Sequence, residues 1–221
     1  MKRNVNLNEI TDGRLYGIND MVRAGCSDCA GCSDCCHTVG DSIKLDPYDI
    51  YRLTTGLGRS FSELLEQGHI ELHMVDGIIL PNLSVPEGAG CTFLNADERC
   101  SIHPHRPGFC RMFPLGRYYH DHTFSYIFQV HECPMEPKTK VKVEKWLDTP
   151  NLQTNQRFIN DWHYFLEELS TKLVTESTPE TQKQVQMYLL NLFFVTPYDA
   201  SLDFYPQFYT RLDKIKPLLA V

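Results

Sequence analysis

The sequence predicts an α+β protein in which a small, irregular, cysteine-rich domain with short β-hairpins precedes a helical C-terminal segment. Three observations predict this class. All nine cysteines lie between Cys26 and Cys133. Turn signals such as Asp-Gly divide the apolar residues of that region into short strands. After about residue 141, apolar residues recur at helical spacing. We therefore expect a cysteine-cluster domain at residues 1–140, with a helical extension at residues 141–221 packed on it.

Two short helices are expected in the middle of the cysteine-rich region. Asp46 and Pro47 are suited to the N-cap and first position of a helix, and Gly58 is suited to its end. Ser60 and Glu63 have the spacing of a capping box, which predicts a second short helix directly afterwards.

Three antiparallel pairings are expected around turn residues. Asp76-Gly77 lies between apolar flanks and predicts a β-hairpin within residues 69–83. A second hairpin is expected within residues 116–130, turning at residues 120–122. Short strands at residues 91–94 and 99–102 are expected on either side of a turn at residues 95–98.

The C-terminal segment is predicted to form long helices. One face of the first helix carries Phe158, Trp162, Phe165, Leu166, Leu169 and Leu173. Thr178 and Pro179 begin a second helix, and apolar residues between Phe204 and Ile215 predict a third. We interpret the aromatic residues of these helices as core.

Composition argues against several classes of function. The chain has 221 residues and a formal net charge of −7, and no Lys/Arg-rich run, so nucleic-acid binding is not expected. The longest apolar stretch, residues 187–195, is too short to span a membrane. The N-terminus lacks the apolar segment of a signal peptide. We therefore expect a cytoplasmic protein with no membrane partner.

The densest cysteine run indicates a metal site. In a reducing cytoplasm, clustered cysteines serve more often as metal ligands than as disulfides. The run contains Cys29-x2-Cys32-x2-Cys35-Cys36, in which each Cys-x-x-Cys pair lets two thiolates reach one metal centre. Counted from Cys26, the spacing Cys26-x2-Cys29-x2-Cys32-x3-Cys36 is that of bacterial ferredoxins, with His37 in place of proline. Both counts remain open, and Cys26 is the uncertain member.

A second set of motifs lies further along the chain. It comprises Cys91-Thr92-Phe93-Leu94, Cys100-Ser101-Ile102-His103, the segment from Arg106-Pro107 through Cys110-Arg111 to Phe113-Pro114, and the later Cys133. With the first run, these motifs resemble the CxxCxxCC family of zinc- or iron-chelating domains, which includes the flagellin lysine N-methylases. The cysteines that match are Cys29, Cys32, Cys35, Cys36, Cys91, Cys100, Cys110 and Cys133. Cys26 is additional, and His103 occupies an aromatic position of the family.

The resemblance implies metal binding by the eight matched cysteines. They would form either two four-thiolate sites or one cluster with accessory thiols. Four thiolates around a divalent metal or a doubly charged cluster core leave a net charge near −2, which needs nearby cations or hydrogen-bond donors. Arg106 and Arg111 flank Cys110 and are candidates for this role. We interpret His37 and His131 as hydrogen-bonding neighbours of the ligands.

Three functions are compatible with these motifs. The first is a metalloprotein that binds an iron–sulfur cluster, such as a 4Fe–4S centre, or zinc, with a redox or electron-transfer role typical of an oxidoreductase. The second, implied by the resemblance, is an S-adenosylmethionine-dependent lysine N-methyltransferase with a protein substrate; it ranks lower because the chain has no familiar glycine-rich methyl-donor loop. The third is a structural zinc module that binds a protein partner. The sequence names no catalytic residue and leaves open whether the protein is an enzyme.

Overall fold

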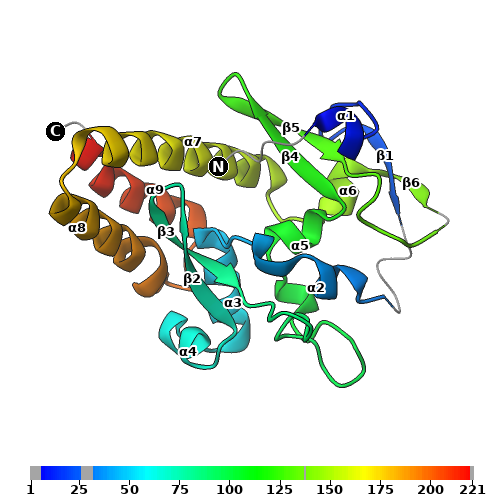
Figure 1. The fold of residues 1–221 in the computed structure, drawn as a ribbon, viewed down its shortest axis with the longest axis horizontal. Coiled ribbons are helices and arrows are strands. Elements are labelled where there is room, and N and C mark those ends of the chain that lie inside the picture. The colour runs from blue at the N-terminus through cyan, green and yellow to red at the C-terminus, as the bar shows by residue number, and fades with distance from the viewer. Residues whose placement is uncertain (1–5, 26–31, 137, 220–221) are drawn as a thin grey trace.

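The computed structural model describes residues 6–25, 32–136 and 138–219, and it confirms an α+β fold (Figure 1). The helices are α1 (Leu7–Ile10), α2 (Asp34–Thr38), α3 (Pro47–Leu57), α4 (Phe61–Glu66), α5 (Gly108–Met112), α6 (Val143–Leu147), α7 (Leu152–Glu176), α8 (Pro179–Leu190) and α9 (Phe204–Ile215). Short helical turns span Gly40–Ser42, His103–His105, Asn191–Val195 and Lys216–Leu219. The strands are β1 (Met21–Gly25), β2 (Ile70–Val75), β3 (Ile78–Leu83), β4 (Leu115–His120), β5 (Thr123–Phe128) and β6 (Thr139–Lys142).

The two predicted short helices form with their expected caps. The Asp46 side chain accepts a hydrogen bond of 2.9 Å from the backbone N–H of Asp49, and the Asp49 carboxylate accepts one of 3.1 Å from the N–H of Asp46. This reciprocal pair is a capping box at the start of α3. Ser60 and Glu63 form the predicted box at the start of α4. Gly58 ends α3 with a φ of 63°, a conformation that favours glycine.

Two of the three expected antiparallel pairings form as hairpins. Asp76 and Gly77 make the β2–β3 turn, and the β4–β5 turn lies at Asp121 and His122; all four residues have positive φ angles. The strands expected at residues 91–94 and 99–102 do not form and are reduced to a single bridge between Leu94 and Cys100. The N–H of Cys91 instead bonds to the carbonyl of Cys36, which joins this segment to α2 rather than to a neighbouring strand.

A pairing between distant segments closes one end of the molecule. β1 pairs antiparallel with β6, with Met21 opposite Lys142 and Gly25 opposite Thr139. Val22, Leu115 and Val143 are buried in the smaller of two apolar cores beneath this pair. In Figure 1, β1 and β6 lie together at the right, away from the C-terminal helices.

The larger core joins the cysteine-rich region to the C-terminal helices. Phe158, Phe193 and Phe208 are fully buried, and their cluster also contains Leu53 of α3 and Leu80 of β3. The predicted N-cap of α8 forms, since the Thr178 hydroxyl accepts from the N–H of Thr181. Within the described ranges, no helix combines the length and apolar character that crossing a membrane requires.

Candidate metal centre

Six cysteines from distant segments surround one cavity of about 350 Å³. They are Cys32, Cys35, Cys36, Cys91, Cys100 and Cys110. The first three lie in or just before α2, the next two lie in the loop after β3, and the last lies in α5. Because Cys36 and Cys91 are 55 positions apart in the chain, the fold rather than local spacing brings α2 to the other cysteines.

Helix α2 presents two adjacent cysteines to the cavity. The N–H of Cys36 donates to the carbonyl of Ser33 over 2.8 Å, which starts the helix. The carbonyl of Cys36 accepts a hydrogen bond of 2.8 Å from the N–H of Cys91. This backbone bond holds Cys91 beside α2.

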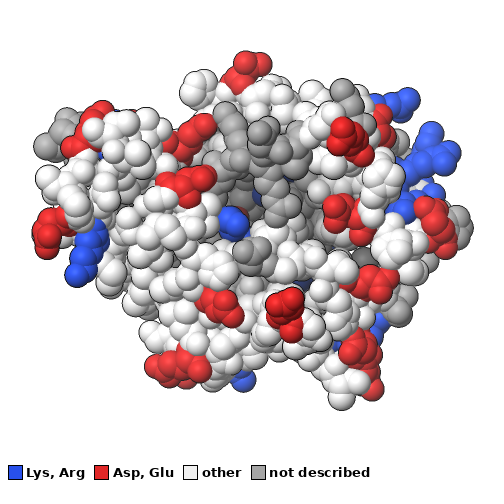
Figure 2. Space-filling view, viewed as in Figure 1, with Lys and Arg blue, Asp and Glu red and all other residues white. Residues whose placement is uncertain are grey.

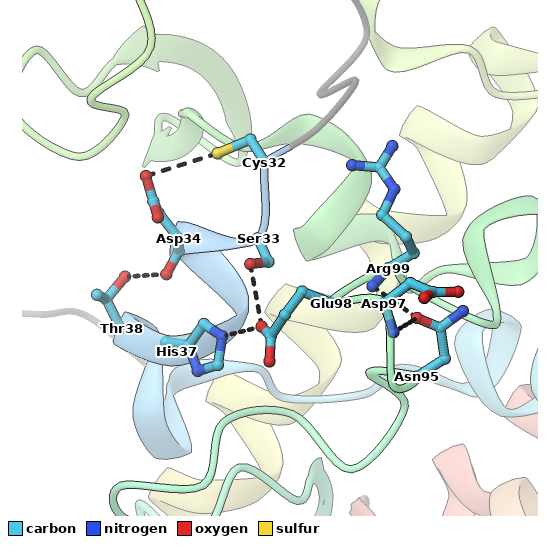
Figure 3. Close-up of polar contacts among 9 residues, drawn as sticks. All are labelled: Cys32, Ser33, Asp34, His37, Thr38, Asn95, Asp97, Glu98 and Arg99. Atoms are coloured by element: carbon cyan, nitrogen blue, oxygen red, sulfur yellow. Dashed lines mark hydrogen bonds and ion pairs between the residues drawn. The ribbon is translucent and has the colours of Figure 1, made fainter.

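The turn between Cys91 and Cys100 is fixed by one asparagine. The Asn95 side-chain oxygen accepts hydrogen bonds from the N–H groups of Asp97 (3.0 Å) and Arg99 (2.9 Å), as Figure 3 shows. The backbone N–H of Asn95 donates a hydrogen bond of 2.9 Å to the carbonyl of Arg99. The Leu94–Cys100 bridge that follows brings Cys100 back towards Cys91. A short-range Asx turn therefore positions this ligand candidate.

Cys110 is positioned by a buried carboxylate of α3. The Asp49 side chain, only 4% exposed, accepts a hydrogen bond of 2.7 Å from the N–H of Gly108 at the start of α5. Asp49 thus caps α3 and anchors α5 at once. Since Cys110 lies in the single turn of α5, this bond fixes where its thiol enters the cavity.

A polar contact joins α2 to the turn that precedes Cys100. Nε2 of His37 lies 2.6 Å from Oε2 of Glu98, and the Ser33 hydroxyl donates to the same oxygen over 3.2 Å (Figure 3). The His37 ring also packs on Gly90, where an added Cβ would lie 2.5 Å from its Nδ1. Gly90 has a φ of 77°, so both its conformation and its surroundings favour glycine. His37 is therefore a link between segments and does not line the cavity.

Four of the thiols lie within electrostatic reach of one another. The pKa of Cys110 is raised well above its ordinary value, first by burial and then by Cys91, Cys35 and Cys100. Burial also raises the pKa of Cys91, and Cys100 and Cys35 raise it further. Burial raises the pKa of Cys100, with an additional contribution from Cys35. Each pair among Cys35, Cys91, Cys100 and Cys110 is therefore close enough to interact.

Each of the other two thiols interacts with Cys35. The hydrogen bond between the Cys35 and Cys36 thiols is the largest cause of the raised pKa of Cys35, followed by burial. The Cys32 thiol donates a hydrogen bond of 3.6 Å to the Asp34 carboxylate. The backbone N–H of Asp34 lowers the pKa of Cys32, but burial, the charge and side-chain hydrogen bond of Asp34, and Cys35 all raise it, and the net shift is upward. Cys32 and Cys36 thus border the set of four.

The sulfurs line the cavity but do not converge on a single position. Among the described residues, no group of three or more His, Cys, Asp or Glu side chains converges closely enough to hold one metal ion. The cavity volume lies near the lower end of the ~300–1,000 Å³ range of small-molecule sites. The donor set fits a thiophilic metal such as zinc or iron.

The remaining predicted residues fall in three places. Cys26 and Cys29 lie outside the described residues, so their predicted ligation stays a prediction. Cys133 is buried but does not belong to the described lining of the cavity. Arg106 lines the cavity, whereas Arg111 does not; its guanidinium donates to the carbonyls of Asp148 (3.0 Å) and Arg106 (3.1 Å).

Sequence reasoning missed Arg99 and Asp49. Arg99 lines the cavity together with Arg106, and its position next to Cys100 was a signal that could have suggested it. Asp49 was readable as part of a capping box with Asp46, since the two are three residues apart. Its bond to Gly108 depends on packing between distant segments and has no local signal.

Comparison with known families identifies the cysteine-rich region. A family described as "CxxCxxCC: Putative zinc- or iron-chelating domain" matches residues 28–140. The chain belongs to the CxxCxxCC family. The matched range contains the whole described lining of the cavity, and Cys26 lies before its start. Neither curated proteins nor solved structures give a match. Membership of a zinc- or iron-chelating family agrees with the thiol-lined cavity.

Proposed function

We propose that the protein is a redox metalloprotein that holds an iron–sulfur cluster through Cys35, Cys91, Cys100 and Cys110. The observation that carries this proposal is the mutual electrostatic reach of these four thiols around one cavity. Four cysteine thiolates are the ligand set of both common cluster types. When bound, such a cluster supplies a centre that accepts and donates electrons.

The spacing of the sulfurs favours a cluster over a single zinc ion. Zn–S bonds of about 2.3 Å in a tetrahedron bring the sulfurs to about 3.8 Å from one another. No three ligating side chains of the described chain converge in this way. A 4Fe–4S cluster binds each thiolate at a different iron, so its ligands stand further apart. The observed arrangement therefore supports iron–sulfur as the first choice and zinc as the second.

Charge around the cavity supports thiolate ligation. Arg106 lowers the pKa of both Cys35 and Cys100, in each case against stronger effects that raise it. Its guanidinium is thus placed to stabilise these sulfurs as thiolates and to offset part of the charge of a four-thiolate centre. This electrostatic effect supports the predicted role of Arg106 in offsetting the charge of the thiolates. Arg111, which bonds backbone carbonyls instead, has no such contact.

The open cavity favours a redox role over a purely structural one. A structural zinc site is closed by its four ligands and has no need of adjoining space. Here the thiols border a cavity of about 350 Å³, which would keep a bound centre accessible to a reaction partner.

Metal analysis of anaerobically purified protein tests the proposal. We expect a brown protein with iron and acid-labile sulfide in equal amounts and visible absorbance that bleaches on reduction with dithionite. A colourless protein with stoichiometric zinc under the same conditions would rule out the cluster. Expression in iron-supplemented medium, with zinc measured in parallel, separates true zinc preference from incomplete cluster assembly.

A further inference from the structure

The cavity beside the thiols has a composition that the metal centre alone does not explain. One part of its lining is apolar, with Val39, Ile43, Leu83, Leu94, Phe109 and Phe113. The charged residues that line it are Arg99 and Arg106, and His103 joins them. No Asp or Glu of the described chain lines it, although the protein carries 28 acidic residues and acidic side chains are spread over the face in Figure 2. The lining therefore combines positive charge with apolar surface.

The two arginines have different surroundings. Nη1 of Arg106 lies 2.9 Å from Nε2 of His103, so this guanidinium is held by a neighbouring ring. Arg99 directly precedes Cys100 in the chain, and its charge is left for another partner.

The backbone around Arg99 is fixed, while its side chain is exposed. The N–H and carbonyl of Arg99 are both bonded to Asn95. The preceding Glu98 is tied to His37 and Ser33. Figure 3 shows the Arg99 guanidinium extending away from this turn. Within the described ranges, no carboxylate forms an ion pair with it.

We propose that the cavity binds a small carboxylic acid with an apolar body, whose carboxylate is held by Arg99 and whose body packs on the apolar lining beside the metal centre. Arginine presents two parallel N–H donors that match a carboxylate. An apolar lining with a few placed polar groups is typical of small-molecule sites. The inference rests on the proposed function, because it gives the redox centre a class of substrate.

Hexanoate is a suitable probe because it has both required parts. Acetate has the carboxylate without the apolar body, and hexanol has the body without the charge. In calorimetric titration of the metal-loaded protein, we expect hexanoate to bind at least tenfold more tightly than either. Equal affinity for hexanoate and hexanol would contradict recognition of a carboxylate.

Two variants make the test specific. Arg99→Gln keeps a polar side chain of similar length but removes the charge, and we expect at least a tenfold loss of hexanoate affinity with unchanged metal content. Arg157→Gln is the matched control, since Arg157 is an exposed arginine of α7; it should bind hexanoate as the wild type does. Arg99→Lys should restore affinity only in part, because lysine lacks the paired donors.

The outcomes separate this inference from the proposed function. Iron and sulfide content reports on the cluster, and the titration reports on the cavity. A protein with an intact cluster that does not bind hexanoate, or that binds it equally after Arg99→Gln, overturns the carboxylate site alone. A shift in reduction potential after Arg99→Gln without a change in hexanoate affinity would mean that Arg99 only balances the charge of the cluster, and would also overturn it.

Discussion

Oε2 of Glu98 lies 2.6 Å from Nε2 of His37, and this contact joins the helix that carries Cys35 and Cys36 to the turn that leads into Cys100. Both side chains are partly exposed. Together with the backbone bond from Cys91 to Cys36, it holds two segments of the cysteine set against each other. Exposed ion pairs stabilise proteins little. We therefore expect the contact between Glu98 and His37 to keep the cysteines in position rather than to add much to the free energy of unfolding.

Replacing Glu98 should loosen the metal centre without unfolding the protein. We expect Glu98→Ala to release its metal several-fold faster than the wild type in the presence of a chelator, with a nearly unchanged thermal midpoint. The rate of metal release from Glu98→Gln should lie between those of the wild type and Glu98→Ala, because the glutamine amide oxygen still accepts a hydrogen bond. Asp97→Ala is the control, since Asp97 is an exposed neighbour in the same turn. Equal release rates for all four proteins would show that the contact does not hold the site.

The same contact predicts a dependence on acid. The hydrogen bond from His37 is the largest cause that lowers the pKa of Glu98 below its ordinary value of 4.5. A carboxyl with a lowered pKa contributes stability above its unfolded-state pKa and loses it as pH falls through the folded-state pKa. We expect metal retention to differ between wild type and Glu98→Gln above pH 4.5 and to converge at more acid pH, as stopped-flow chelation would show.

Adjacent cysteines provide a sharp test of the ligand set. Cys35 belongs to the four mutually interacting thiols, whereas Cys36 is hydrogen-bonded to Cys35 and is not one of the four. Cys35→Ser should lose most of its iron. Cys36→Ser should keep it, because Cys36 is not one of the four proposed ligands. Iron and sulfide analysis of both purified variants decides the assignment, and loss of iron from Cys36→Ser alone would contradict it.

Local parts of the fold were predictable, and the assembly of the site was not. Asp46, Ser60 and the Asp76-Gly77 turn act through bonds within a few residues, so their sequence patterns gave the correct helices and hairpin. The β1–β6 pairing has no local turn signal, and it was missed. Spacing and resemblance predict the cysteines as ligands, which stays a prediction, but only packing brings Cys110 to Cys35. The predicted division at residue 140 stays a prediction.

Asp49 offers a test of how the distant Cys110 is positioned. Its carboxylate is buried and accepts the N–H of Gly108. Asp49→Ala would leave that donor unpaired and should cost about 1.5–3 kcal/mol of unfolding free energy, the range for a hydrogen bond to a charged group. Asp49→Asn keeps an acceptor for Gly108 and should retain more metal than Asp49→Ala. Urea denaturation and metal content together check this order; equal metal content in the two variants would mean that the Gly108 bond does not place Cys110.

Metal removal should leave the C-terminal helices folded. Phe158, Phe193 and Phe208 are packed in the larger core, and none of them lines the cavity. Small zinc domains unfold without metal because they have little other core. Here we expect chelation to lower the thermal midpoint but to preserve most of the far-ultraviolet helical signal. A complete loss of that signal would show that the metal centre supports the whole fold.

A second pH effect should arise from the two carboxylates at the start of α3. Burial, followed by the charge of Asp49, raises the pKa of Asp46 well above its ordinary value of 3.8. Burial also raises the pKa of Asp49. Their attraction to Arg117, whose own pKa they help to raise, offsets the cost only in part, because two carboxylates face one guanidinium.

The sign of this effect is opposite to that for Glu98. A raised carboxyl pKa means that the folded protein binds the proton more tightly than the unfolded chain, so stability falls as pH rises above the unfolded-state pKa and through the folded-state pKa. Asp46→Asn removes this titration and keeps an N-cap acceptor for the N–H of Asp49. We expect it to stabilise the protein at neutral pH, because a neutral amide avoids the cost of a buried charge beside Asp49.

Urea denaturation between mildly acid and neutral pH measures this gain. The free energy of unfolding of the wild type should fall as pH rises across that range. That of Asp46→Asn should depend less on pH. Asp213→Asn is the control, because Asp213 is an exposed carboxylate of α9; its profile should follow that of the wild type. Destabilisation of Asp46→Asn at neutral pH would show that the attraction between Asp46 and Arg117 outweighs the repulsion between Asp46 and Asp49.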